Sequence, residues 1–337
     1  MNYIITNREI LDNGNIREDG KEHAGDNLRF GTYNIETKTF QLFPEPKKTT
    51  DVAYDNISEK DIGNLKGSSR FFVELYQNLT NENFDKTSDE NDKTDVLFFI
   101  HGFNTDLNGV RDNFNTLHEK YVENKKSTIK HLVIFSWPGK DLKIPLHYHD
   151  DKKDAIRSGE TLARGFKKLE DFFRLFLVQE RNVPCNRKIH LMVHSMGHRV
   201  LKHMLLELDK VPCIFDQILL MAADIEYDIF HPDKAFFKTI DLGNRVHVFY
   251  NKKDKVLDIS KYLKNFDNRL GRYGRKQVDP GLIDVYDTDT TKTKDDSIYG
   301  FKEDALNHWY YYSCKDVVDD VISIFKGNKS KFIDTTI

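Results

Sequence analysis

The sequence predicts an α/β fold with a mostly parallel β-sheet and helices on both of its faces. Six short segments are rich in Val, Ile, Leu and Phe and are apolar on both faces, as a sheet covered on both sides requires. They alternate with amphipathic segments, which predicts βαβ units with right-handed crossovers. The predicted strands are residues 96–100, 131–135, 189–193, 217–222, 246–250 and 282–286.

Helical periodicity predicts the helices that connect these strands. In residues 153–178, apolar side chains recur every three or four positions, while basic and acidic side chains occupy the other face. Another helix is predicted directly after Ser195, and a last one over residues 315–325, where five apolar side chains share one face. The strands and helices therefore alternate to the end of the chain.

The first 91 residues have a different pattern. A strand at 3–6, a hairpin-like pattern at 28–43 and a helix at 68–79 precede a polar stretch at 80–95, which we interpret as a solvated loop. We therefore expect a small β-containing N-terminal extension, residues 1–91, that packs on a main domain of residues 92–330.

Composition excludes several classes of protein. The 337 residues carry 51 Lys and Arg against 54 Asp and Glu, a net charge of −3, which argues against a general nucleic-acid-binding surface. No apolar run approaches the roughly 18–20 residues that cross a bilayer, and the N-terminus lacks the pattern of a signal peptide. Three distant cysteines (Cys185, Cys213 and Cys314) predict reduced thiols and no disulfide framework. These features predict a cytoplasmic protein; the oligomeric state is left open.

A serine follows the third predicted strand of the sheet. The apolar strand leads into His194-Ser195-Met196-Gly197 and then directly into a helix. A serine at such a turn is held at the carboxyl end of the sheet, near helix N–H groups that favour a developing negative charge. Gly197 supplies a small neighbour, and His194 is expected to help form the wall of the site. The alternative interpretation of Ser195 is a helix N-cap.

The first predicted strand, residues 96–100, leads into His101-Gly102-Phe103. A loop of this kind can aim a backbone N–H toward the serine. The amides of Phe103 and Met196 would then form a two-donor oxyanion hole, an arrangement whose loss typically slows a reaction by about 100- to 1000-fold. The alternative is a turn that only ends the strand.

The carboxylate and the imidazole that would activate a serine follow later in the chain, in the order Ser, acid, His. Asp254 lies just beyond the predicted strand 246–250, and Asp224, which ends the strand 217–222, is a rival. His308 follows the last predicted strand and precedes the C-terminal helix, which makes it the best placed of the 13 histidines. Taken together, these motifs predict a serine hydrolase with Ser195 as nucleophile, His308 as base and Asp254 as its partner.

A metal site is the weaker interpretation of the histidines. The segment His147-Tyr-His149-Asp150 is rich in potential ligands. His190, His194 and His198 are four residues apart, but they extend over a strand, a turn and a helix and so do not share one helical face. We therefore expect neither a metal nor another cofactor.

Two other segments have open interpretations. The arginine-rich segment 269–276 is either a solvated loop or a site that attracts an anionic substrate. The segment 226–240, with Phe236 and Phe237, is either part of a cap over the pocket or a plain surface helix.

The ordered motifs together resemble the bacterial α/β-hydrolases that are grouped as a family of unknown function. The resemblance runs through Thr6-Asn7-Arg8, Phe99-Ile-His-Gly-Phe-Asn104, Phe135-Ser-Trp-Pro-Gly139, His194-Ser-Met-Gly197, Ala222-Ala-Asp224-Ile, Asn251-Lys-Lys-Asp254-Lys-Val-Leu and Asn307-His308. It implies the α/β-hydrolase fold and the triad Ser195, Asp254 and His308. The chain departs from the expected pattern at Val193, His198 and Ala223.

The function expected from these residues is hydrolysis of a carboxylic ester, from a small molecule or a lipid, through an acyl-enzyme on Ser195. A phospholipase or lipase-type effector, a thioesterase or an acyltransferase would use the same residues, because the pocket selects the leaving group and the acceptor. A non-catalytic binding module with this fold is the alternative from another class.

Overall fold

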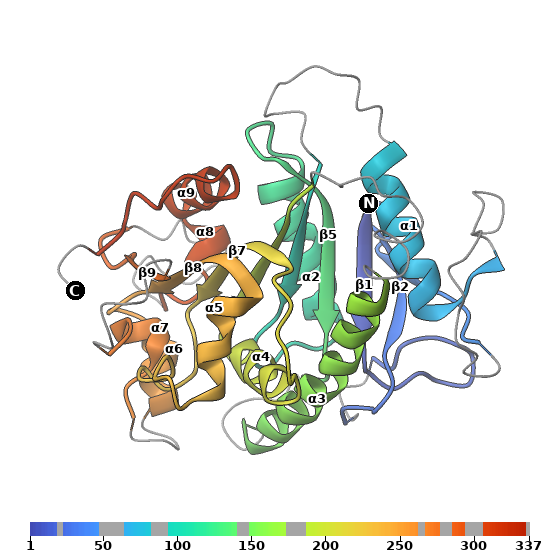
Figure 1. Ribbon diagram of the computed structural model, residues 1–337, viewed down its shortest axis with the longest axis horizontal. Helices are drawn as coiled ribbons and strands as arrows, with labels where there is room; N and C mark the ends of the chain where they lie inside the picture. Colours follow the sequence, from blue (N-terminus) through green and yellow to red (C-terminus); the bar gives the residue numbers. More distant parts are fainter. Residues whose placement is uncertain are drawn as a thin grey trace.

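A mixed β-sheet runs through the centre of the molecule (Figure 1). The computed structural model describes residues 1–18, 23–46, 64–81, 94–139, 148–172, 187–261, 267–276, 285–293 and 306–334. Within these ranges the sheet has nine strands. They are β1 (Asn2–Thr6), β2 (Arg29–Asn34), β3 (Thr39–Leu42), β4 (Asp95–Ile100), β5 (Ile129–Ser136), β6 (Ile189–His194), β7 (Phe215–Met221), β8 (Gly243–Tyr250) and β9 (Val285–Asp289).

The strand order is β3-β2-β1-β5-β4-β6-β7-β8-β9. From β1 to β9 all neighbouring strands are parallel, whereas β2 and β3 add an antiparallel edge next to β1. The predicted fold class, a mostly parallel sheet with a β-containing N-terminal extension, is therefore confirmed. Because the parallel strands point the same way, the loops after β4, β6, β7 and β8 lie at one edge of the sheet, where α/β proteins bind ligands.

Helices cover both faces of the sheet, as Figure 1 shows. One apolar core contains side chains from α1 (Gly67–Asn81), α3 (Tyr148–Phe172) and α4 (Gly197–Leu206). The other contains side chains from α2 (Leu107–Leu117), the π-helical turn η3 (His118–Val122), α8 (Tyr310–Ser313) and α9 (Lys315–Phe325). The side chains of β4 alternate between the two cores. Val96, Phe98 and Ile100 face the first core, and Leu97 and Phe99 face the second.

Most of the predicted elements are present, and the differences have local causes. Helix α2 was not predicted, because its three Asn and one Gly are poor helix formers. Its start is stabilised by Asp106, whose side chain accepts a hydrogen bond from the Gly109 amide. Strand β9 runs from Val285 to Asp289, later than the predicted 282–286. Residues 282–284, 173–178 and 82–93, and Cys185, lie outside the described residues.

Four shorter helical segments lie beside the late strands. They are the 3₁₀ turn η5 (Ala235–Lys238), α5 (Thr239–Leu242), α6 (Lys255–Ser260) and α7 (Leu270–Tyr273). Helices α6 and α7 follow the carboxyl end of β8, whereas η5 and α5 precede its start. In the segment 226–240, Phe236 is fully buried against Phe230 and near His198, so this part of the segment packs on α4. In the described part of the chain, no helix has the length and hydropathy to cross a membrane.

Several buried histidines are held neutral. Burial, and secondarily the charge of Arg245, lowers the pKa of His247 to about 3. Burial lowers the pKa of His131 to about 3 as well, and the N-terminal ammonium group adds to this effect. Unfolding releases such side chains to water, where a histidine takes up a proton near pH 6.5. The stability that neutral burial confers is therefore lost as the pH falls below about 6.5.

His247→Gln tests this linkage away from the candidate site. Between pH 6 and pH 5 the unfolded wild type takes up a proton on His247, which the variant lacks. The free energy of unfolding should therefore fall more in the wild type than in the variant. The decrease in the variant should be smaller by about 1 kcal/mol. Urea denaturation at the two pH values measures the difference, and equal decreases would contradict a neutral, buried His247.

Candidate active site

The turn after β6 holds Ser195 in a left-handed backbone conformation, with φ +50°. The amide of Ser195 donates to the carbonyl of Met221 at the end of β7 (3.1 Å). Its carbonyl accepts from the amides of His198 and Asp224 (both 3.2 Å) and from His198 Nδ1 (2.8 Å). A non-glycine residue in this conformation costs about 1–3 kcal/mol, so these four hydrogen bonds have to maintain it.

Two glycines let the loop after β4 approach this turn closely. A Cβ on Gly197 would lie 2.6 Å from the carbonyl oxygen of His101, and one on Gly102 would lie 2.9 Å from the Cβ of Ser195. The loop with Phe103 and the turn with Met196 are therefore in backbone contact, as the oxyanion-hole prediction requires. Val193, two residues before the serine, points into the first core and leaves this contact open.

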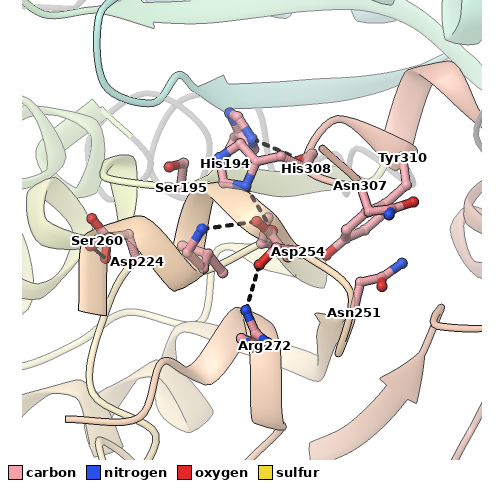
Figure 2. Close-up of polar contacts among 12 residues, drawn as sticks. His194, Ser195, Asp224, Asn251, Asp254, Ser260, Arg272, Asn307, His308 and Tyr310 are labelled. Carbon is pink, nitrogen blue, oxygen red and sulfur yellow. Dashed lines mark hydrogen bonds and ion pairs between the residues drawn. The ribbon is translucent and has the colours of Figure 1, made fainter. Parts of the chain in front are cut away.

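The side chains of His308 and Asp254 are in direct polar contact (Figure 2). The distance between His308 Nδ1 and Asp254 Oδ2 is 2.7 Å, and both side chains are buried. Asp254 is also the N-cap of α6, since its Oδ1 accepts from the Leu257 amide (2.9 Å). Both oxygens of the carboxylate are thus engaged, and the proton on His308 Nδ1 leaves Nε2 as an acceptor. In the view of Figure 2 the His308 ring lies between Ser195 and Asp254.

Backbone contacts place the segment that carries His308. The amide of Lys255 donates to the carbonyl of Leu306 (3.1 Å), which ties this segment to the start of α6. Asn307 has a positive φ of 48° and turns the chain immediately before the histidine. On the other side, His194 Nε2 donates to the carbonyl of His308 (3.2 Å). His194 therefore supports the main chain of His308, and its ring lies 4.7 Å from the His308 ring.

Burial shifts the pKa values of Asp254 and His194. Burial raises the pKa of Asp254, and the adjacent His308 opposes that rise by favouring the carboxylate. Burial also keeps the pKa of His194 well below its ordinary value, and a charge on His308 would lower it further. A neutral His194 adds no competing positive charge next to His308.

Both ring nitrogens of His101 form hydrogen bonds with the backbone. Its Nε2 accepts from the Trp137 amide (3.1 Å), so the proton of the neutral ring is on Nδ1, which donates to the carbonyl of Gly102 (2.9 Å). The ring stacks on Trp137 with the centroids 5.1 Å apart. His101 is thus a fully buried side chain that fixes the loop after β4.

Asp224 lies beside the serine turn but has different partners. Its amide donates to Ser195, while its Oδ1 accepts from Ser260 Oγ (2.7 Å) and lies 3.4 Å from Arg269 Nε. Asp224 and Arg269 are both buried, so Asp224 belongs to a buried ion pair beneath the turn.

The arginine-rich segment is neither a solvated loop nor an open anion site. Arg269 pairs with Asp224, Arg272 with Asp258 (2.6 Å) and Arg275 with Asp287 (2.9 Å). Arg272 also donates to the backbone carbonyl of Asp254 (3.0 Å). The segment therefore braces α6 and the end of the sheet, a function that its positive charge alone did not reveal.

The family model of the alpha/beta hydrolases of unknown function (DUF900) matches residues 77–324. The chain belongs to this family. The match includes β4 to β9 and both His308 and Asp254, so the resemblance predicted from the motifs is confirmed. A search of curated proteins found no significant match.

The contacts that three residues make at this site were not predicted. The Tyr310 hydroxyl donates to the carbonyl of Phe249 (2.9 Å) and accepts from the Ala222 amide (2.8 Å), so it joins the ends of β7 and β8. His198 holds the carbonyl of Ser195, and Arg8 reaches the loop after β4. Tyr310 stands in a run of aromatic residues without a distinguishing pattern. Arg8 and His198 were named, in the motif Thr6-Asn7-Arg8 and among the histidines, but the sequence did not predict what they contact.

The histidines of the metal interpretation do not converge in the described residues, which contain no group of three or more potential ligands. His190 lies 3.7 Å from Asp95 near the amino-terminal ends of β6 and β4, whereas His194 and His198 lie at the opposite edge. His147 and the side chain of His149 lie outside the described residues.

Gly197→Ala tests the close approach between the turn and the loop after β4. The new Cβ would meet the carbonyl oxygens of His101 and Ile100, which belong to the backbone and cannot move freely. We expect the free energy of unfolding to fall by about 1–3 kcal/mol in urea denaturation. Gly165→Ala is the matched control, since its Cβ would meet only the flexible end of Leu28. An equal loss in both variants would contradict the proposed contact.

Proposed function

We propose that this α/β-hydrolase is a serine hydrolase that cleaves carboxylic esters through an acyl-enzyme on Ser195. The observation that supports the proposal most directly is the 2.7 Å contact between His308 and Asp254 beside the strained serine turn. This contact uses Nδ1 of the imidazole and leaves Nε2 to accept a proton from a hydroxyl group.

In the first half of the reaction, Ser195 Oγ attacks the ester carbonyl carbon while His308 Nε2 takes the hydroxyl proton. The carbonyl oxygen becomes an oxyanion, which the amides of Phe103 and Met196 stabilise. The intermediate then breaks the bond to the alcohol, and His308 returns the proton to that leaving group. An acyl group remains on Ser195.

In the second half, water repeats the attack on the acyl carbon with the same base. His308 takes a proton from the water, the bond to Ser195 Oγ breaks, and Oγ recovers the proton. Asp254 holds the imidazole in the tautomer that accepts protons at Nε2 and stabilises its charged form during each attack. These steps require no cofactor.

A small-molecule ester or lipid and a cytoplasmic location stay predictions of the sequence. The apolar cavity next to α1 and α3 does not identify an acyl pocket. It is lined by Val96, Ile189 and Phe215, near the starts of β4, β6 and β7, whereas Ser195 follows the end of β6. The proposed substrate must therefore be tested directly.

A fluorophosphonate probe tests the nucleophile. The wild-type protein should form a covalent adduct at Ser195, because an activated serine hydroxyl displaces fluoride from the probe and becomes phosphonylated. Ser195→Ala should remain unlabelled although it folds, as circular dichroism would establish. Peptide mass spectrometry locates the adduct. A folded wild type without an adduct at Ser195 would refute the proposed function and favour a binding module.

Asp254→Asn and Asp224→Asn separate the two carboxylates. Asp254→Asn should lower kcat for a p-nitrophenyl ester by about 10³- to 10⁴-fold, because it favours the wrong tautomer of His308. Asp224→Asn should mainly lower the thermal midpoint, because it leaves the charge of Arg269 without its buried counter-ion. If instead Asp224→Asn lost more kcat than Asp254→Asn, the assignment of Asp254 would be wrong.

A further inference from the structure

Arg8 belongs to the N-terminal segment, yet it lies at the edge of the sheet where Ser195 is found. It follows β1, which pairs in parallel with β5. Both strands therefore end at the same edge of the sheet. The Arg8 side chain is only 3% exposed, so its charge is buried within the molecule. A buried guanidinium is stable only when its donors are satisfied.

The Arg8 guanidinium bridges the end of β5 and the loop after β4. Its Nε donates to Ser136 Oγ (2.8 Å), and an Nη donates to the backbone carbonyl of Thr105 (2.6 Å). Hydrogen bonds from a charged donor are shorter and stronger than neutral ones. Arg8 thereby fixes the position of Thr105, two residues after Phe103.

The same loop is held from its other side. The Asn104 amide donates to Asp151 Oδ2 in α3 (3.3 Å), and Thr105 Oγ1 donates to the carbonyl of Gly102 (3.3 Å). A Cβ on Gly139 would lie 2.8 Å from the amide nitrogen and the carbonyl oxygen of Thr105. The loop of residues 102–105 is thus fixed between Arg8, α3 and the segment that follows β5.

His101 sets the orientation of one peptide group in this loop. Its Nδ1 donates to the carbonyl of Gly102. Because a trans peptide is planar, the amide of Phe103 points away from that carbonyl and hence away from the imidazole. His101 has to stay neutral for this arrangement, and burial together with the charge of Arg8 lowers its pKa to about 3.

We propose that Arg8 is a positioning residue for the oxyanion hole, which it supports through the carbonyl of Thr105 and the loop of residues 102–105. This inference rests on the proposed function. The amide of Phe103 is needed most in the transition state, when the oxyanion carries its full charge. Loss of Arg8 should therefore affect kcat far more than KM.

The test compares Arg8→Gln with its neighbour variant Asn7→Ala on a short p-nitrophenyl ester, well below both thermal midpoints. Asn7 is equally buried, but its side chain donates to Ser158 Oγ (3.0 Å) and to the carbonyl of Gly25 (3.2 Å) and not to the loop. We expect Arg8→Gln to lower kcat by about 10- to 100-fold with KM within about threefold. Asn7→Ala should lower the thermal midpoint and keep kcat within about twofold.

Ser136→Ala provides a second measurement if Arg8→Gln does not fold. It removes the acceptor of Arg8 Nε and leaves the bond to the Thr105 carbonyl in place. We expect a fall in kcat of about threefold or more at an unchanged KM.

Two results would overturn the inference: an unchanged kcat in the variants of Arg8 and Ser136, or an equal loss of kcat in Asn7→Ala. Failure of the proposed function is distinguishable, since wild-type Ser195 would then not react with the fluorophosphonate. A labelled wild type with normal kcat in both Arg8→Gln and Ser136→Ala would refute only the role of Arg8.

Discussion

The left-handed backbone of Ser195 is the constraint on which the rest of the site depends. Its positive φ stands between the end of β6 and the start of α4, so Ser195 lies in a tight turn at the carboxyl edge of the sheet. The end of β7 and Asp224 after it supply two of the four hydrogen bonds that hold the turn, so the position of Ser195 depends on the pairing of β6 with β7. The buried ion pair of Asp224 and Arg269 then supports the end of β7 from below.

Backbone strain is concentrated around this edge. In the described residues five non-glycine residues have a positive φ, and four of them (Asn104, Ser195, Ala222 and Asn307) lie in segments that meet at the site. Each such residue costs about 1–3 kcal/mol, which the surrounding contacts have to offset. The buried hydrogen bonds of His198, Tyr310 and His101 supply such contacts. Strain held in this way keeps the polar groups in fixed positions before a substrate arrives, which is the condition for electrostatic stabilisation of a charge.

The sequence predicted those features that depend on short-range patterns. Strands that are apolar on both faces are recognisable one at a time, and parallel strands place the residues after them at one edge. This is why Ser195, Asp254 and His308 could be chosen together. The choice between Asp254 and Asp224 was harder, because both follow a strand and only the start of α6 turns one of them toward His308. The pairing of the arginines in residues 269–276 was beyond prediction, since their carboxylate partners lie on three other elements.

The N-terminal segment illustrates a further limit of local patterns. Strand β1 is short, and a charged residue two positions after a strand is normally a solvated loop residue. Arg8 is buried because β1 lies between β2 and β5. The pairing of β1 with β5 joins residues about 130 positions apart in the sequence. The family match begins only at residue 77, whereas the bridge from Arg8 to Thr105 connects the segment before it with the loop after β4. The division at residue 91 stays a prediction, but the sheet and this bridge make residues 1–8 part of the same folded unit as the site. The loop after β4 is thus held from two sides, by Arg8 at the carbonyl of Thr105 and by Asp151 at the amide of Asn104.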